Sequence, residues 1–279
     1  MGSSGGPTDA GPWGGGNPYG PPPGYGPSGY ASPGYGPPGA PYGGSSRPAP
    51  ATAGAATSLA FSRFGRAAGP MIGLFVILIA VSVALEFSLT SVLAAAGLEG
   101  PYGDLTEAGF REDGLSYTGT LIVALVTAVV TGASALLLAI GSLRAVRTGS
   151  LRFSEFFALP RGWAAYVGVA VALSVLPELL PSAGGGLVLG LAALVGWVLV
   201  LFVPHHLADS DQGFAAALAA SARTVGANLG QVLLLMLISL GLVVAGTLAC
   251  GVGLLAAVPI VSLALAALYT GFRGEVVPA

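Results

Sequence analysis

Residues 71–85 read MIGLFVILIAVSVAL, an unbroken apolar run without a charged side chain. Extended to about residues 70–93, this run is long enough to cross the hydrocarbon core of a bilayer as a helix. The whole chain of 279 residues is 54% hydrophobic and only 8% charged, whereas about a quarter of an ordinary soluble domain is charged. The sequence therefore predicts a bilayer-embedded chain and excludes a water-soluble globular enzyme with an ordinary surface.

Further apolar runs of spanning length follow the first one. The third run is the weakest, because Pro177, Glu178 and Pro181 lie at its far end. We expect an all-α membrane protein whose domain, residues 59–279, has six transmembrane helices, near 70–93, 117–143, 163–180, 186–204, 231–250 and 253–272.

The placement of arginine predicts the orientation of these spans, since the chain has no lysine. In a six-span arrangement only Arg111 falls on one side of the membrane. The side rich in Lys and Arg is usually cytoplasmic, so we expect cytoplasmic N- and C-termini. The arginines that share this side are Arg47, Arg63, Arg66, Arg144, Arg147, Arg152, Arg161, Arg223 and Arg273.

Each pair of spans follows a short amphipathic segment, which predicts three interfacial helices. In the first segment Phe61 and Phe64 share one face, and Arg63 and Arg66 occupy the opposite face. An alternative stays open, because any six-span chain with short loops divides into pairs. The interfacial anchors that we expect are Phe61, Arg63, Phe64, Arg66, Phe153, Phe156, Phe157 and Phe214.

Residues 1–58 differ from the rest of the chain, because they hold many of its 45 glycines and 21 prolines and almost no aliphatic side chains. Such a segment cannot offset the entropy of ordering its backbone, so the sequence predicts a disordered Pro/Gly/Tyr-rich tail. Two interpretations stay open, a passive spacer and an interaction tail that contacts protein partners. The second rests on evenly spaced tyrosines, Tyr19, Tyr25, Tyr30, Tyr35 and Tyr42.

Two sets of polar residues are candidates for chemistry. His205, His206, Asp209 and Asp211 offer ligands for a divalent metal. The alternative is local structure, since histidines at a helix end complement its dipole and Asp209 can cap the next helix. Intramembrane carboxylates are transport or proton-relay candidates, and Glu86 and Glu178 belong to this class unless they lie at the outer interface.

Several functions are not indicated. No nucleophile–base pair or cofactor motif is present, so we expect neither enzymatic activity nor a cofactor. The formal net charge of −2 argues against a nucleic-acid partner. The lipid bilayer is the partner that the composition predicts directly, and a homo-oligomer stays open.

The last third of the chain carries a resemblance. It reads GFAAALAAS over residues 213–221, has the pattern Gly-x-x-x-Cys-Gly-x-Gly-Leu-Leu from Gly246 to Leu255, and continues with Pro259 and Tyr269. This region resembles a group of uncharacterised bacterial six-span integral membrane proteins, which includes the membrane domain of some glycerophosphodiester phosphodiesterases. It is similar in particular to actinobacterial proline/glycine-rich transmembrane proteins. The resemblance implies six spans with interfacial helices in the bacterial plasma membrane, and it supplies no catalytic residue.

The leading functional hypothesis is a non-enzymatic membrane adaptor or scaffold that recruits partners through its tail. The competing hypothesis is a small transporter or a lipid-handling membrane protein. It rests on Glu86 within a span and on Pro204 and Pro259, since broken helices form sites in transporters.

Overall fold

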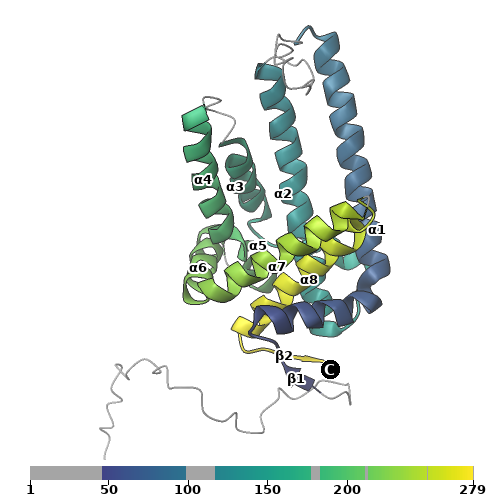
Figure 1. Ribbon diagram of the computed structural model, residues 1–279, viewed down its shortest axis with the longest axis vertical. Coiled ribbons are helices and arrows are strands. Elements are labelled where there is room, and N and C mark those ends of the chain that lie inside the picture. Colours follow the sequence, from purple (N-terminus) through teal and green to yellow (C-terminus); the bar gives the residue numbers. More distant parts are fainter. Residues whose placement is uncertain (1–45, 99–116, 177–182, 211–212, 250, 279) are drawn as a thin grey trace, which may run out of the picture. The chain divides into compact units, whose positions relative to one another are not determined.

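The computed structural model describes residues 46–98, 117–176, 183–210, 213–249 and 251–278. The tyrosines of the predicted tail, Arg111, Glu178 and Asp211 lie outside this part of the chain. The described chain is mostly helical (Figure 1), and its elements are β1 (Ser46–Pro48), α1 (Ala53–Ala95), α2 (Tyr117–Thr148), the 3-10 helix η2 (Phe153–Phe157), α3 (Trp163–Val175), α4 (Ala183–Val200), α5 (Val203–Asp209), α6 (Phe214–Ala227), α7 (Leu229–Leu248), α8 (Leu254–Phe272) and β2 (Val276–Pro278).

Within the described ranges, five helical stretches are long and apolar enough to cross a membrane, as in a multi-pass membrane protein. They are α1, α2, α7, α8 and the stretch Leu187–Asp209, which combines most of α4 with α5. The predicted span near 163–180 corresponds to α3, a helix of 13 residues that ends at Val175, shortly before Pro177. Such a helix is about 20 Å long, which is shorter than the roughly 30 Å hydrocarbon core.

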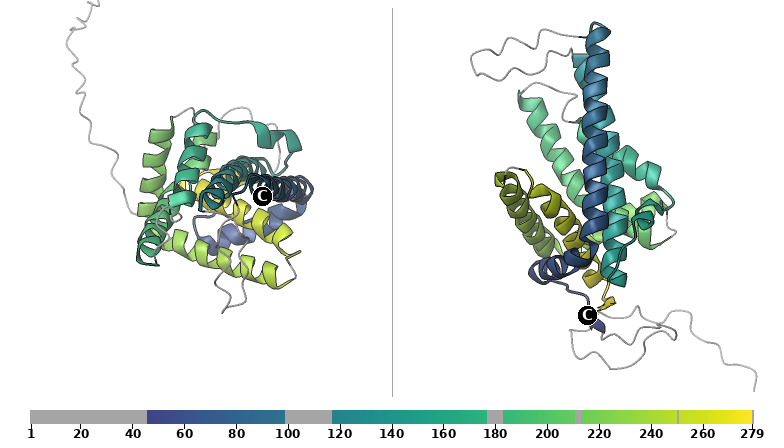
Figure 2. Two further views of the ribbon diagram at one scale, coloured as in Figure 1. Left: turned by 90° about the horizontal axis from the view of Figure 1, so that it is seen from above. Right: turned by 90° about the vertical axis from the view of Figure 1, so that its right-hand side faces the viewer.

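The first interfacial segment and the first span form one continuous helix of 43 residues instead of two elements. Figures 1 and 2 show that α1 starts across one end of the bundle and then turns to run along it. Pro70 is the proline inside this helix. A proline removes one hydrogen bond and pushes against the preceding turn, so it permits a bend without ending the helix.

The folded part of the chain begins earlier than the sequence predicted. The compact unit starts at Gly44, so residues 46–58 belong to it and not to the tail. Strand β1 pairs with β2 in antiparallel register, with Arg47 opposite Val277. The first backbone N–H of α1, that of Ala53, donates to the Gln231 side chain of α7 at 2.9 Å. Tertiary partners of this kind stabilise a Pro- and Ala-containing segment that has little tendency to fold alone.

Helix α8 lies at the centre of the packing. In its most apolar window 67% of the residues are buried, against 6% for α1, whose apolar residues from Val76 to Val92 are largely exposed. Helix α1 packs on α8 along a buried face of mostly small residues, which allows close approach of the two backbones. This face includes Ala53, Ala56, Leu59, Ala60, Ala67, Met71 and Leu74.

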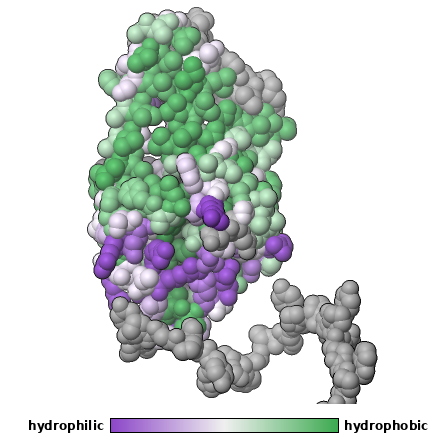
Figure 3. Space-filling view, turned by 180° about the vertical axis from the view of Figure 1, so that it is seen from behind, coloured by the Kyte–Doolittle hydropathy of each residue, from purple (hydrophilic) through white to green (hydrophobic). Residues whose placement is uncertain are grey.

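Hydrophilic residues gather at one end of the molecule, while the rest of the visible surface is apolar (Figure 3). We call this end the polar end. Strands β1 and β2, the first part of α1 and the ends of α2 and α8 lie there (Figure 1). The charged side chains of the candidate functional site lie at this end.

Candidate functional site

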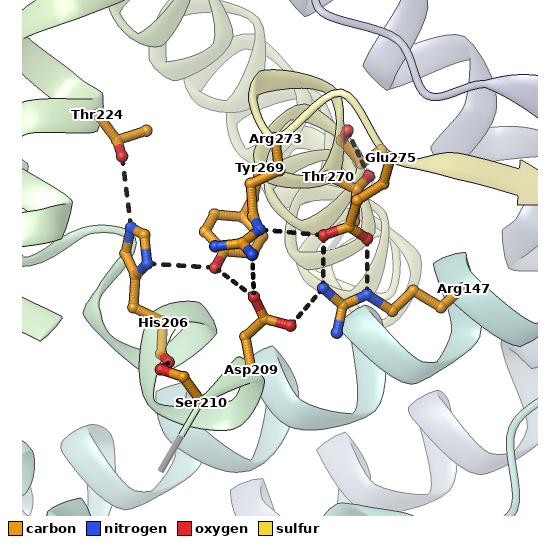
Figure 4. Close-up of polar contacts among 10 residues, drawn as sticks. Arg147, His206, Asp209, Ser210, Thr224, Tyr269, Thr270, Arg273 and Glu275 are labelled. Atoms are coloured by element: carbon orange, nitrogen blue, oxygen red, sulfur yellow. Dashed lines mark hydrogen bonds and ion pairs between the residues drawn. The ribbon is translucent and has the colours of Figure 1, made fainter. Parts of the chain in front are cut away.

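Four charged side chains from distant parts of the sequence meet at the polar end (Figure 4). Arg147, near the end of α2, donates from Nε and Nη2 to the two carboxylate oxygens of Glu275, at 2.8 and 2.7 Å. The same Nη2 lies 2.6 Å from Oδ1 of Asp209, the last residue of α5. Arg273, which follows α8, lies 3.2 Å from both carboxylates. The cluster joins α2, α5 and the segment between α8 and β2.

The cluster is electrically balanced and partly withdrawn from solvent. Two guanidinium groups face two carboxylates, and the Asp209 and Glu275 side chains are 11% and 24% exposed. A bidentate contact between a guanidinium and a carboxylate is stronger and more directional than a single ion pair. The arrangement therefore fixes the geometry of the polar end and leaves little net charge for a ligand.

A chain of polar contacts extends the cluster to α6. The Tyr269 hydroxyl donates to Asp209 at 3.2 Å and lies 3.2 Å from Nδ1 of His206. Nε2 of His206 lies 3.4 Å from the hydroxyl oxygen of Thr224. The Arg273 guanidinium lies 5.8 Å from the centre of the Tyr269 ring, within range of a cation–π contact. Tyr269 thus links the charged cluster to α5 and α6.

The two histidines lie on α5, which a break in the helix separates from α4. The buried side chain of Ser221, on α6, bridges this break. Its hydroxyl donates to the Leu199 carbonyl at 2.6 Å and accepts from the Phe202 N–H at 3.2 Å. Ser221 therefore satisfies backbone groups that the break withdraws from the helix. This role accounts for a polar side chain that is fully buried on α6.

We expect Ser221→Ala to lower the free energy of unfolding by about 1–2 kcal/mol, because two buried backbone groups lose their partner. The measurement is thermal or denaturant unfolding of the purified protein in detergent. Ser91→Ala is the matched control, since the exposed Ser91 hydroxyl bonds only to the carbonyl one turn earlier in its own helix. Equal stability of the two variants would contradict this role for Ser221.

An apolar cavity of about 210 Å³ lies between α2, α3, α4, α5 and α8, with Tyr166, Trp197, His205 and Ser262 among its lining residues. His205 is 3% exposed, and neither ring nitrogen has a hydrogen-bond partner among the described residues. Its ring contacts those of Phe202 and Tyr269, with centroids 5.9 and 5.4 Å away, and these two rings also contact each other at 5.9 Å. The cavity is smaller than the roughly 300–1,000 Å³ of typical small-molecule pockets, so it has room for one chain or ring.

The predicted metal-ligand set is not assembled within the described residues. His206 faces Tyr269 and Thr224, Asp209 is held by two arginines, and Asp211 lies outside the described residues. No group of three His, Cys, Asp or Glu side chains that could hold a metal ion occurs in the described part. The predicted cap is not formed either, because the N-cap residue of α6 is Gly213 and no side chain caps that helix. His206 and Asp209 instead contact residues that are distant in the sequence.

Glu86 lies on α1 with its residue exposed. It borders a void of about 10 Å³ shared with α2 residues that include Thr127. A void of this size is at the lower limit for a single water molecule, so it offers no path for a solute. Glu178 lies outside the described residues.

The predicted interfacial anchors differ in how far they are exposed. Phe61, Phe153 and Phe157 are 50%, 41% and 54% exposed, as an interfacial position requires. Phe64 and Phe214 are half-buried and Arg66 is exposed. Two residues differ from the prediction. Phe156 is fully buried, and Arg63 lies on the buried face of α1 with a side-chain N–H donating to the Pro278 carbonyl.

Sequence reasoning missed Arg147, Arg273 and Glu275 as partners, since nothing in the linear order of the chain pairs them. Tyr269 is part of the resemblance, but its link to Asp209 depends on the packing of α8 against α5. Comparison of the chain with family models, with curated proteins and with solved structures gives no match.

Proposed function

We propose that the protein is a non-enzymatic adaptor or scaffold of the bacterial plasma membrane, which recruits partners through its N-terminal tail. The observation that carries this proposal is the attachment of the segment that follows the tail. Residues Ser46–Pro48 pair with β2, and the Ala49 N–H donates to the Glu275 carbonyl at 2.8 Å. The start of the described chain is therefore fixed by its pairing with β2 near the charged cluster, and such an anchor suits a binding segment that precedes it.

The proposal includes six spans, because it counts α3 in addition to the five longer stretches. In Figure 1 the chain reaches the polar end along α2, runs away from that end along α3 and runs back toward it along α4. This path is the one that a third and a fourth span would follow. A hydrophobic element shorter than the bilayer is accommodated by local thinning or by neighbouring helices. The resemblance to six-span bacterial membrane proteins stays a prediction and agrees with this count.

Cytoplasmic termini are part of the same proposal. The polar end carries Arg47, Arg147 and Arg273 as well as both β-strands, and such an excess of arginine favours the cytoplasmic side. Exposed Phe61, Phe153 and Phe157 support a position of this end at the headgroups, where aromatic side chains are enriched.

The test compares proteins that crosslink in cells to the full chain, to a chain lacking residues 1–43, and to a full-length chain with serine at Tyr19, Tyr25, Tyr30, Tyr35 and Tyr42. The deletion stops at residue 43 because the compact unit begins at Gly44. We expect one discrete partner of the full chain to be lost from both variants, while their unfolding temperatures in detergent stay unchanged.

A deletion of residues 1–58 is the control for loss of stability. It also removes β1 and the start of α1, so it should lower the unfolding temperature. An identical set of crosslinked proteins for the full chain and the chain lacking residues 1–43 would refute the adaptor proposal.

The second candidate function, a lipid-handling protein, is favoured by the apolar cavity. Its lining combines an apolar wall with the polar groups of Tyr166, Trp197 and Ser262, and its size suits one acyl chain of an amphiphile whose remainder lies in the bilayer. Pro204, at the start of α5, also lines it, so the helix break lies beside the cavity.

The test uses Trp197 as the reporter, after Trp13 and Trp163 are replaced by phenylalanine. We expect dibrominated stearate to quench Trp197 fluorescence saturably in detergent. Ala135→Leu should abolish the saturable part, because Ala135 lines the cavity. Ala192→Leu, at an exposed alanine of α4, should leave it intact. The same quenching in all three proteins would reject the cavity as a binding site.

A further inference from the structure

A second cavity, of about 590 Å³, lies at the polar end between the start of the described chain and the first part of α1. Its lining includes Arg47 from β1 and Ser58, Ser62, Arg63 and Arg66 from α1. Ser58, Ser62 and Arg66 recur at intervals of four positions and so share one helical face, and Arg63 follows Ser62 at the edge of that face. The pairing of β1 with β2 brings Arg47 to this face.

The cavity is strongly cationic. Three of its lining residues are arginines, and none of the described residues that line it is acidic. The ion pairs of the described chain use Arg147 and Arg273, so Arg47, Arg63 and Arg66 have no carboxylate partner there. Like charges so close together repel one another, and an anion between them would relieve that repulsion.

Arg63 is the least ordinary of the three arginines. It is 3% exposed, one guanidinium nitrogen donates to the Pro278 carbonyl, and buried Nε has no partner among the described residues. A buried cation without a counter-ion is costly. An anion in the adjoining cavity would stabilise this charge, with the exposed Arg47 and Arg66 as its direct donors.

The position of the cavity favours a phosphate group of a lipid. Arg66 precedes Met71, where the long apolar run begins, by only five residues, so it lies close to the edge of that run. Exposed Phe61 lies on the same part of α1. Guanidinium groups at this depth match the level of the phosphates of a bilayer, and basic pockets at that level bind anionic headgroups. The Ser58 and Ser62 hydroxyls add polar groups to the same wall.

We infer that this cavity binds the phosphate group of an anionic phospholipid, with Arg47 and Arg66 as phosphate donors and Arg63 as the buried charge that favours an anion. The inference is independent of the tail. It also makes β1 part of a lipid site, because a phosphate held by both Arg47 and Arg66 would connect β1 to α1.

The experiment uses the full-length protein in dodecyl maltoside with added dioleoyl phosphatidylglycerol, dioleoyl phosphatidylcholine or inorganic phosphate at equal ionic strength. The unfolding temperature and the bound lipid, counted by native mass spectrometry, are the two measurements. Phosphatidylglycerol should raise the unfolding temperature saturably. Arg47→Gln and Arg66→Gln should each weaken its apparent affinity about tenfold. Both residues are exposed, so these variants should fold.

Arg144→Gln is the control, because Arg144 is an exposed arginine of α2 that does not line the cavity. Its affinity should stay within about twofold of the unchanged protein, since it removes the same net charge away from the site. An equal loss in Arg144→Gln, or equal stabilisation by phosphatidylcholine, would overturn the inference. Equal stabilisation by inorganic phosphate at the same concentration would replace the lipid by free phosphate and overturn the lipid assignment.

Discussion

Arg147→Ala should lower the free energy of unfolding by about 3 kcal/mol, because it leaves two partly buried carboxylates with Arg273 as their single remaining cation. Arg147 makes the bidentate contact with Glu275 and the 2.6 Å contact with Asp209. Its side chain is 29% exposed, so water compensates for part of the loss and the low end of the range for buried pairs applies. The measurement is unfolding in detergent, followed by tryptophan fluorescence.

The matched control is Arg144→Ala, one turn earlier on α2, where the arginine is exposed and has no ion pair among the described residues. We expect it to change stability by less than about 0.5 kcal/mol. A double-mutant cycle with Asp209→Asn should give a coupling energy of more than about 1 kcal/mol. Equal effects at Arg147 and Arg144, or additive effects at Arg147 and Asp209, would show that the cluster does not hold the polar end together.

Gly271→Ala should lower the free energy of unfolding by a similar amount, about 3 kcal/mol, because a methyl group there overlaps backbone and not a movable side chain. A Cβ built on Gly271 would collide with the carbonyl group of Pro50 and would lie 2.9 Å from the Ala51 backbone nitrogen. The segment around Pro50 cannot easily retreat, since the Ala49 N–H is bonded to the Glu275 carbonyl and β1 is paired with β2. Unfolding in detergent is again the measurement.

Gly241→Ala provides the control for this substitution. Gly241 is also a helical glycine, in α7, but a Cβ there meets no atom within 4 Å. Alanine is the better helix former by about 1 kcal/mol, so this variant should be as stable as the unchanged protein or more stable. Comparable stability of Gly271→Ala and Gly241→Ala would mean that the segment around Pro50 packs less closely on α8 than the structure has it.

The predicted interfacial helices show where sequence periodicity reaches its limit. Phe61 and Arg63 are two positions apart and face different sides of α1, as the periodicity requires. The sequence could not decide which side faces the protein, because the apolar side of an interfacial helix can face lipid or other helices. The buried side is the one with Ala56, Ala60 and Ala67, since small residues allow α8 to approach. Arg63 is on that side and Phe61 is on the exposed side.

The candidate site shows the same limit in another form. His206 and Asp209 are candidate metal ligands because they are neighbours in the sequence, and both of them make polar contacts in the structure. Their partners, however, are Tyr269, Arg147 and Arg273, which lie far away along the chain. A charged residue at the end of an apolar run can contact solvent, lipid headgroups or another residue, and local sequence does not distinguish these outcomes.

The sequence by itself determined the class of this protein, because long apolar runs almost without charge must form helices within a bilayer. It also determined where most of those helices lie, since most of the long apolar runs correspond to helices of the structure. Only the tertiary structure decided that the folded part begins with β1, that α4 and α5 are separate helices, and that Arg147, Asp209, Arg273 and Glu275 meet. The physical reason is that these features depend on contacts between distant segments, whereas insertion of an apolar helix into lipid depends on that helix alone.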